Sequence, residues 1–251
     1  MTIDVNDRPI GPGEPEAPPI PPVLELVGVR ASYGSIQVLH GVDLTVHPGQ
    51  VVALLGPNGG GKTTTVKLAA GLLPLTGGEL RYAGQKVNGV SAETAAGMGV
   101  CLIPEGRGVF ANLTVRENLW LATGTGASRE QIEERAYFRF PILQDRRNQL
   151  AGSMSGGEQQ MLALSRALAT DPAVLLLDEL SMGLAPMIVS QMYDTVAQLV
   201  EEGISVLVAE QFARTVLPIA DVAAVMLQGR IAAVGSPAEI DADLSTTYLG
   251  G

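Results

Sequence analysis

Eight consecutive residues have the types and the spacing that can hold phosphate groups. They fit the pattern G-x-x-x-x-G-K-[ST] and are Gly56, Pro57, Asn58, Gly59, Gly60, Gly61, Lys62 and Thr63, with Thr64 next in the chain. Glycines let backbone N–H groups turn toward phosphate oxygens, and a helix that starts here adds the positive end of its dipole. Lys62 would place its charge against the β- and γ-phosphates, and the Thr63 hydroxyl would ligate Mg²⁺. The segment predicts a site for a nucleoside triphosphate with Mg²⁺.

A second candidate is an apolar stretch, Val174–Leu177, that ends in the carboxylates Asp178 and Glu179. In a phosphate site of this type Asp178 would bind the metal ion. Glu179 would then lie beside the γ-phosphate, where a carboxylate can orient and deprotonate the attacking water. An acidic pair after a strand, taken alone, more often caps a helix. The glycine-rich segment upstream favours the catalytic interpretation.

A third candidate is formed by Ser155, Gly156, Gly157 and Glu158 at the start of a predicted helix. A serine and two glycines at a helix N-terminus make a second anion site, while Ser155 and Glu158 also fit a capping box. Both interpretations can hold, because the cap directs the amides outward. Placed between the other two segments, this one resembles the signature motif of ATP-binding cassette ATPases. The resemblance implies that it contacts the γ-phosphate of ATP bound to a facing subunit.

The resemblance assigns roles to further residues. Tyr33 matches the aromatic residue that stacks on adenine, and Glu105 stands in the Q-loop, where most members have a Gln that contacts Mg²⁺. Gln211 stands at the switch position, where most members have a His that hydrogen-bonds to the γ-phosphate. Ala185 replaces the usual Asp of the D-loop, and Leu180 replaces the Pro that usually follows the catalytic Glu.

Several of these departures occur together in one subfamily. Glu105, Ala185 and Gln211 are expected in one of the two ATPase subunits of branched-chain amino acid importers, whereas Leu180 is not. The resemblance covers about residues 23–250 and rests on the segments 104–119, 154–163, 183–186, 210–211 and 248–250.

The resemblance implies a subunit that binds and hydrolyses ATP with Mg²⁺ and powers an importer at the cytoplasmic face of the membrane. Its implied partners are a second cassette ATPase, in a homodimer or heterodimer, two transmembrane permease subunits and an extracytoplasmic substrate-binding protein. Three alternatives remain open: an importer of urea or short amides, a soluble cassette ATPase that acts on DNA or ribosomes, and a regulatory module that binds ATP but hardly hydrolyses it.

The composition of the chain argues against several classes of protein. The 251 residues are 46% apolar and 17% charged, which argues against intrinsic disorder. A net charge of −10 argues against binding to nucleic acid through a basic surface. The single cysteine, Cys101, excludes an internal disulfide framework and suits a reducing compartment. We also expect no membrane-spanning segment, because every apolar run is too short.

The pattern of apolar residues predicts an α/β fold of the P-loop NTPase type, with a mixed sheet core, an N-terminal antiparallel β subdomain and an inserted helical subdomain. Residues 1–22 contain seven prolines and predict a disordered arm, which leaves one ATPase domain over 23–251 with the helical part at about 113–169. Predicted antiparallel strands are Leu24–Val29 and Val42–Val46, and predicted core strands are Val51–Leu55, Gly99–Ile103, Val174–Leu177, Ile204–Ala209 and Val222–Leu227. Predicted helices are Lys62–Leu72, Thr114–Ala122, Ser128–Phe138 and Glu158–Ala169, with Thr123–Gly126 as a loop between two of them.

Overall fold

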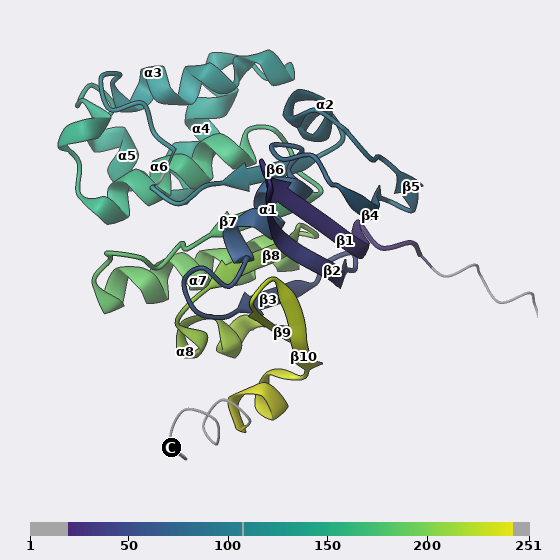
Figure 1. Ribbon diagram of the computed structural model, residues 1–251. Helices are drawn as coiled ribbons and strands as arrows, with labels where there is room; N and C mark the ends of the chain where they lie inside the picture. Colours follow the sequence, from purple (N-terminus) through teal and green to yellow (C-terminus); the bar gives the residue numbers. More distant parts are fainter. Residues whose placement is uncertain (1–19, 107, 243–251) are drawn as a thin grey trace, which may run out of the picture.

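Two β-sheets, one antiparallel and one mostly parallel, organise the chain in the computed structural model (Figure 1). The structure describes residues 20–106 and 108–242. Most of the predicted arm over residues 1–22, and the segment 248–250 used for the resemblance, lie outside the described residues.

The larger sheet has six strands in the order β10-β9-β3-β8-β7-β6. Its interior strands are continuous apolar runs, because helices or the second sheet cover both faces. In β3, Val51 and Ala53 belong to one hydrophobic core and Val52 and Leu54 to the other. The predictions for Val51–Leu55 and Val222–Leu227 are confirmed. The strands are β3 (Val51–Leu55), β6 (Val100–Ile103), β7 (Val174–Asp178), β8 (Ser205–Glu210), β9 (Val222–Leu227) and the antiparallel β10 (Arg230–Gly235).

The smaller sheet is antiparallel, as predicted, with the order β2-β1-β4-β5. Its first strand is longer than predicted, so Tyr33 is the last residue of that strand and does not follow it. β4 and β5 were not predicted. In β4, Glu79 and Arg81 alternate with buried Leu80 and Tyr82, the pattern of a strand buried on one face, over only four residues, and β5 has only two residues. The strands are β1 (Leu24–Tyr33), β2 (Ile36–Val46), β4 (Gly77–Tyr82) and β5 (Gln85–Lys86).

Helix α1 (Lys62–Ala69) lies between the two sheets and contacts β7 and β8 on one side and β1 and β2 on the other. It ends three residues earlier than predicted, at the cap Ala70. The second core, which lies around this helix, therefore joins the sheets through one element that begins at the glycine-rich segment. Helix α2 (Ala92–Gly97) packs on β6.

Short helices fill the range predicted to be an inserted helical part. Three of them begin at capping boxes, in which Thr114, Ser128 and Ser155 are paired with Glu117, Gln131 and Glu158. The predicted loop Thr123–Gly126 is partly wrong, because its first three residues belong to a 3₁₀ helix. The elements are α3 (Val115–Trp120), η1 (Leu121–Thr125), α4 (Arg129–Arg139), α5 (Pro141–Asp145), η2 (Ala151–Ser153) and α6 (Gly156–Leu168).

Helices α7 (Pro186–Glu201) and α8 (Ala213–Val216) contact β8, and the 3₁₀ helix η3 (Leu217–Ile219) follows α8. In the described part of the chain, no helix has the length and apolarity needed to cross a membrane. The sheet order places β8 between β3 and β7, with Leu55 opposite Glu210 and Ala209 opposite Asp178. The residues that follow these three strands therefore meet at one edge of the sheet.

Candidate functional site

The glycine-rich segment runs from the end of β3 to the start of α1. A side chain at Gly56 would clash with the carbonyl oxygen of Met226 in β9, so the close approach of the two backbones requires glycine there. The Gly60 N–H donates to the carbonyl of Pro57 at 3.1 Å, and the Gly229 N–H donates to the carbonyl of Gly60 at 2.8 Å. The turn after β9 thus holds the glycine-rich loop through a backbone hydrogen bond.

Lys62 is buried at the first turn of α1. Its Nζ lies 3.0 Å from Oε1 of Glu179, which is also buried, and donates to the carbonyls of Gly56 at 2.9 Å and Pro57 at 3.3 Å. Two buried charges are tolerated because each compensates the other, and removing one partner leaves an unpaired charge in a medium of low polarity. The pair joins the glycine-rich segment to the acidic segment that the sequence predicted to act with it.

A second contact joins the same two segments. The Thr63 hydroxyl donates to Oδ1 of Asp178 at 3.0 Å, while the buried Oδ2 of Asp178 has no hydrogen-bond partner among the described residues. Burial raises the pKa of the Asp178 carboxyl, the Thr63 hydrogen bond opposes this, and the charges of Glu179 and Glu105 add to the rise. A buried carboxylate oxygen without a partner is a suitable ligand for a cation.

The residues present fit Mg²⁺ better than a metal held by protein alone. No group of three or more His, Cys, Asp or Glu side chains in the described chain could hold an ion. Mg²⁺ usually takes one or two protein ligands and completes its shell with phosphates and water. Thr63 and Asp178 supply such a pair, at the same place where Lys62 could meet phosphate oxygens.

Glu179 occupies a strained turn directly after β7. Its φ of 53° lies in the left-handed region, which is uncommon for residues other than glycine. Its N–H donates to the carbonyl of Ala209 at 2.9 Å, which fixes the turn to the neighbouring strand β8. The next helix, α7, begins after the cap Ala185, so the alternative of an acidic helix cap at Asp178 and Glu179 is wrong.

The Ser155–Glu158 segment begins α6 and forms the expected capping box: Oγ of Ser155 accepts from the Glu158 N–H, and Oε2 of Glu158 accepts from the Ser155 N–H at 2.8 Å. Gly157 packs against Ile188 of α7, and Arg146 forms an ion pair with Glu158 at 2.6 Å. Ser155 itself is exposed. No hydrogen bond or ion pair between described residues joins the segment to the glycine-rich loop, so one chain leaves this helix terminus open.

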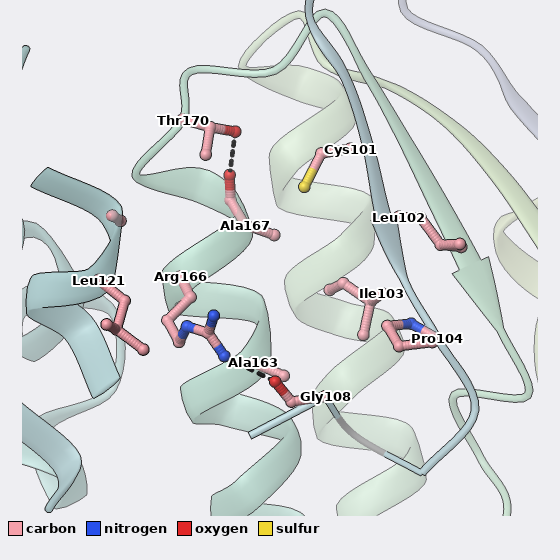
Figure 2. A pocket seen from close by; sticks show the side chains of 11 residues that line it. Cys101, Leu102, Ile103, Pro104, Gly108, Leu121, Ala163, Arg166, Ala167 and Thr170 are labelled. Carbon is pink, nitrogen blue, oxygen red and sulfur yellow. Dashed lines mark hydrogen bonds between the residues drawn. The ribbon is translucent and has the colours of Figure 1, made fainter. Parts of the chain in front are cut away.

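The loop after β6 contains Glu105 and is held to α6. Arg166 donates to the carbonyl of Gly108 at 2.6 Å, and its guanidinium lies 5.0 Å from the centre of the Phe110 ring. A pocket of about 200 Å³ lies between this loop, η1 and α6. Figure 2 shows the side chains of Cys101 and Arg166 among those that line it. Burial raises the pKa of the Cys101 thiol, so the group is a poor nucleophile here.

The remaining predicted site residues lie at or just after the ends of strands and are exposed or half exposed. Tyr33 is half exposed at the end of β1, Gln211 is exposed directly after β8, and Glu105 is exposed after β6. Of these, Glu105 acts on Asp178 through its charge. Sequence reasoning used Glu210 only as part of the resemblance and assigned it no role, whereas the structure shows that it is fully buried beside Gln211. The sequence feature that could have drawn attention to Glu210 is a charged residue at the end of a continuous apolar strand.

One protein-family model matches a range of the chain that contains all three predicted segments. The family model described as ABC transporter matches residues 39–181, which include the glycine-rich loop, Ser155–Glu158 and the acidic pair. A solved structure described as a nucleotide-free ATP-binding cassette from an ABC transporter superposes with a TM-score of 0.78 at 26% identity, and the match covers 89% of this chain and 95% of that one.

Two curated proteins, whose names give different transport roles, are similar to this chain over most of its length. The chain is 41% identical over 227 residues to the high-affinity branched-chain amino acid transport ATP-binding protein BraG of Pseudomonas aeruginosa, covering 89% of this chain and 97% of BraG. It is 33% identical over 228 residues to the lipopolysaccharide export system ATP-binding protein LptB of Escherichia coli strain K12, covering 87% of this chain and 93% of LptB.

Replacing Lys62 tests the phosphate site. Lys62→Ala should weaken Mg·ATP binding by about 10²-fold or more, because charge-assisted hydrogen bonds to the phosphates are lost. It should also lower the melting temperature, since Glu179 stays buried without its partner. The double variant Lys62→Ala with Glu179→Gln should recover stability but not affinity. Titration calorimetry and thermal melting check this, with the exposed Lys86→Ala as control; unchanged affinity in folded Lys62→Ala would contradict the assignment.

Replacing Glu179 tests the water-activating group. Glu179→Gln should lower kcat for ATP hydrolysis by about 10²-fold or more, the range for loss of a general base. Affinity for Mg·ATP should be equal to or higher than that of the parent, because the carboxylate no longer competes with phosphate for Lys62. Phosphate release in steady state measures the rate, with the exposed Glu134→Gln as matched control. A kcat within about twofold of the parent would show that another group activates water.

Proposed function

Since the chain belongs to the ABC transporter family, whose ATP-binding domains hydrolyse ATP, we propose that it powers an importer of branched-chain amino acids. The observation that carries the substrate class is the similarity to BraG over nearly the whole of both chains. Glu105, Ala185 and Gln211, which depart from the general family pattern, are consistent with this subfamily.

In the proposed mechanism Lys62, Thr63 and Asp178 hold Mg·ATP at the edge of the sheet, and Gly56, Pro57, Asn58, Gly59, Gly60, Gly61 and Thr64 enclose the phosphates. When bound, Mg²⁺ neutralises charge that develops on the transferred phosphoryl group. Tyr33 stacks on the adenine, and Glu105 approaches the metal through the loop after β6. The burial of Lys62 and the partnerless Oδ2 of Asp178 support this assignment.

Glu179 acts as the general base. Phosphate oxygens take its place on Lys62, and the released carboxylate accepts a proton from water while the water oxygen forms a bond to the γ-phosphorus. The bond from the γ-phosphorus to the oxygen of ADP breaks at the same centre, and the products are ADP and inorganic phosphate. The 3.0 Å pair supports this role for Glu179, because the carboxylate lies at the lysine that would contact the phosphates.

A second cassette completes the site. Ser155, Gly156, Gly157 and Glu158 form a capped helix N-terminus whose first residue, Ser155, is exposed, and no hydrogen bond or ion pair between described residues links it to this chain's own phosphate loop. We therefore assign it to the γ-phosphate of ATP on a partner cassette, whose own segment closes over Lys62 of this chain. Gln211 would donate its side-chain amide to the γ-phosphate in this closed state. The partner is a second copy or a related cassette.

Closure would reach the membrane through the loop after β6. Arg166 of α6 holds Gly108 of this loop, so a displacement of α6 is transmitted to the loop directly (Figure 2). The proposed assembly contains two permease subunits that dock near this loop at the cytoplasmic face of the membrane, together with an extracytoplasmic substrate-binding protein. Nucleic acid has no role in it, in line with the negative net charge.

Reconstitution tests the substrate class. The chain is purified with its permease subunits, placed in proteoliposomes with ATP on the cassette side, and supplied with the substrate-binding protein. Uptake of radiolabelled leucine, isoleucine or valine should depend on ATP and be lost with Lys62→Ala. Uptake of urea or acetamide without the amino acids would support the amide importer instead, and association with no permease would favour a soluble ATPase.

Replacing Gln211 in the assembled complex tests its proposed contact with the γ-phosphate. Gln211→Ala should slow hydrolysis at this chain's site by the value of one charge-assisted hydrogen bond, about 1.5–3 kcal/mol or about 10- to 10²-fold. Gln211→His should hydrolyse at the parental rate or faster, because histidine can also donate to the phosphate. Single-turnover kinetics, with the partner's catalytic glutamate replaced, isolates this site. Parental turnover by Gln211→Ala would show that Gln211 makes no contact with the γ-phosphate.

A further inference from the structure

Glu210 is a buried carboxylate to which the mechanism above gives no role. It is the last residue of β8 and is fully buried, and three hydrogen bonds converge on it. Oε1 accepts from the Ser181 N–H at 2.9 Å and from the Tyr193 hydroxyl at 2.6 Å, and Oε2 accepts from the Ser181 hydroxyl at 2.9 Å. Burial of a charged group is unfavourable, so its presence here calls for a physical reason.

These hydrogen bonds act on the turn that carries Glu179. Ser181 follows Glu179 by two residues, and the Glu179 N–H is bound to the carbonyl of Ala209, the neighbour of Glu210. The strained residue is thus held on both sides by consecutive residues of β8: the Ala209 carbonyl before it and the Glu210 carboxylate after it. Positive φ at a residue other than glycine persists only where the surroundings enforce it.

The same carboxylate connects two further elements. Through the Tyr193 hydroxyl it is attached to α7, and through the chain it leads directly to Gln211. On the other side of the turn, Gln160 of α6 donates to the carbonyl of Leu180 at 3.4 Å. The turn after β7 is therefore held by β8 through the Ala209 carbonyl and Glu210, and by α6 through Gln160. Helix α7 reaches the turn only through the hydrogen bond of Tyr193 to Glu210.

We propose that Glu210 is a positioning residue that holds the turn after β7 so that the Glu179 carboxylate keeps the geometry needed to activate water. The proposal rests on the assignment of Glu179 as the general base. Glu210 does not touch nucleotide or water in this account. Its main effect falls on the chemical step, because Lys62 is also held by the carbonyls of Gly56 and Pro57, and Asp178 by the Thr63 hydroxyl.

Glu210→Ala should lower kcat by about tenfold or more, since small displacements of a reacting group are costly, and leave KM for ATP within about threefold. Glu210→Gln should keep most of the activity. Its amide oxygen can accept both hydrogen bonds now made to Oε1, and its NH₂ can donate to the Ser181 hydroxyl. Rescue by glutamine together with loss by alanine would identify hydrogen bonding, and not charge, as the positioning force.

A matched pair of tyrosine variants separates positioning from general stability. Tyr193→Phe and Tyr82→Phe each remove one buried phenol hydrogen bond of 2.6 Å, the second one to the Ala69 carbonyl between α1 and the antiparallel sheet. Tyr193→Phe should lower kcat several-fold, and Tyr82→Phe should leave it within about twofold. Equal kcat values for the two variants would overturn the proposal, even if Glu210→Ala does not fold.

A double-mutant cycle shows whether Glu210 acts through Glu179. In the Glu179→Gln background, where single-turnover assays still measure the residual rate, Glu210→Ala should have an effect of no more than about twofold. The same fractional loss in both backgrounds, a parental kcat in Glu210→Ala, or a loss confined to KM would each overturn the proposal. Full activity of Glu179→Gln would instead refute the base assignment, so the two failures are distinguishable.

Discussion

The buried ion pair between Lys62 and Glu179 is the interaction on which the rest of the site depends. It brings the phosphate-binding loop and the end of β7 together, and it keeps both buried charges compensated. The hydrogen bond from Thr63 to Asp178 runs in parallel with it. Two contacts therefore join the loop and the acidic segment, and in the proposed mechanism phosphate oxygens replace Glu179 as the partner of Lys62.

This pair requires a particular sheet order. β8 separates β3 from β7, so the lysine and the carboxylates reach toward each other across the end of a third strand. That strand contributes the Ala209 carbonyl, the Glu210 carboxylate and the Gln211 side chain in three consecutive residues. β8 therefore has two roles. It lies between β3 and β7 in the sheet, and its last residues hold the turn that carries Glu179, the proposed base, and lead to Gln211, the proposed γ-phosphate contact.

The sequence predicted that the glycine-rich and acidic segments meet at this edge, because each follows a continuous apolar strand and the pattern marks such strands as buried and parallel. It predicted the capping box at Ser155 for a similar reason, since the pairing with Glu158 is local. It did not predict the partners of Glu210, because Ser181 lies 29 residues away and the contact depends on the register of β7 with β8. It also missed β4, whose charged residues Glu79 and Arg81 form exposed or half-buried ion pairs with Lys86 and Glu25.

The most direct test of the central claim is a crystal structure of the chain with Mg²⁺ and a non-hydrolysable ATP analogue. The account predicts that Lys62 Nζ leaves Glu179 and contacts the β- and γ-phosphates, that the metal lies beside Thr63 and Asp178, and that the Glu179 carboxylate stays at the γ-phosphate, free to hold a water molecule. A nucleotide bound with the Lys62–Glu179 pair still at 3.0 Å, or bound away from the glycine-rich loop, would contradict it.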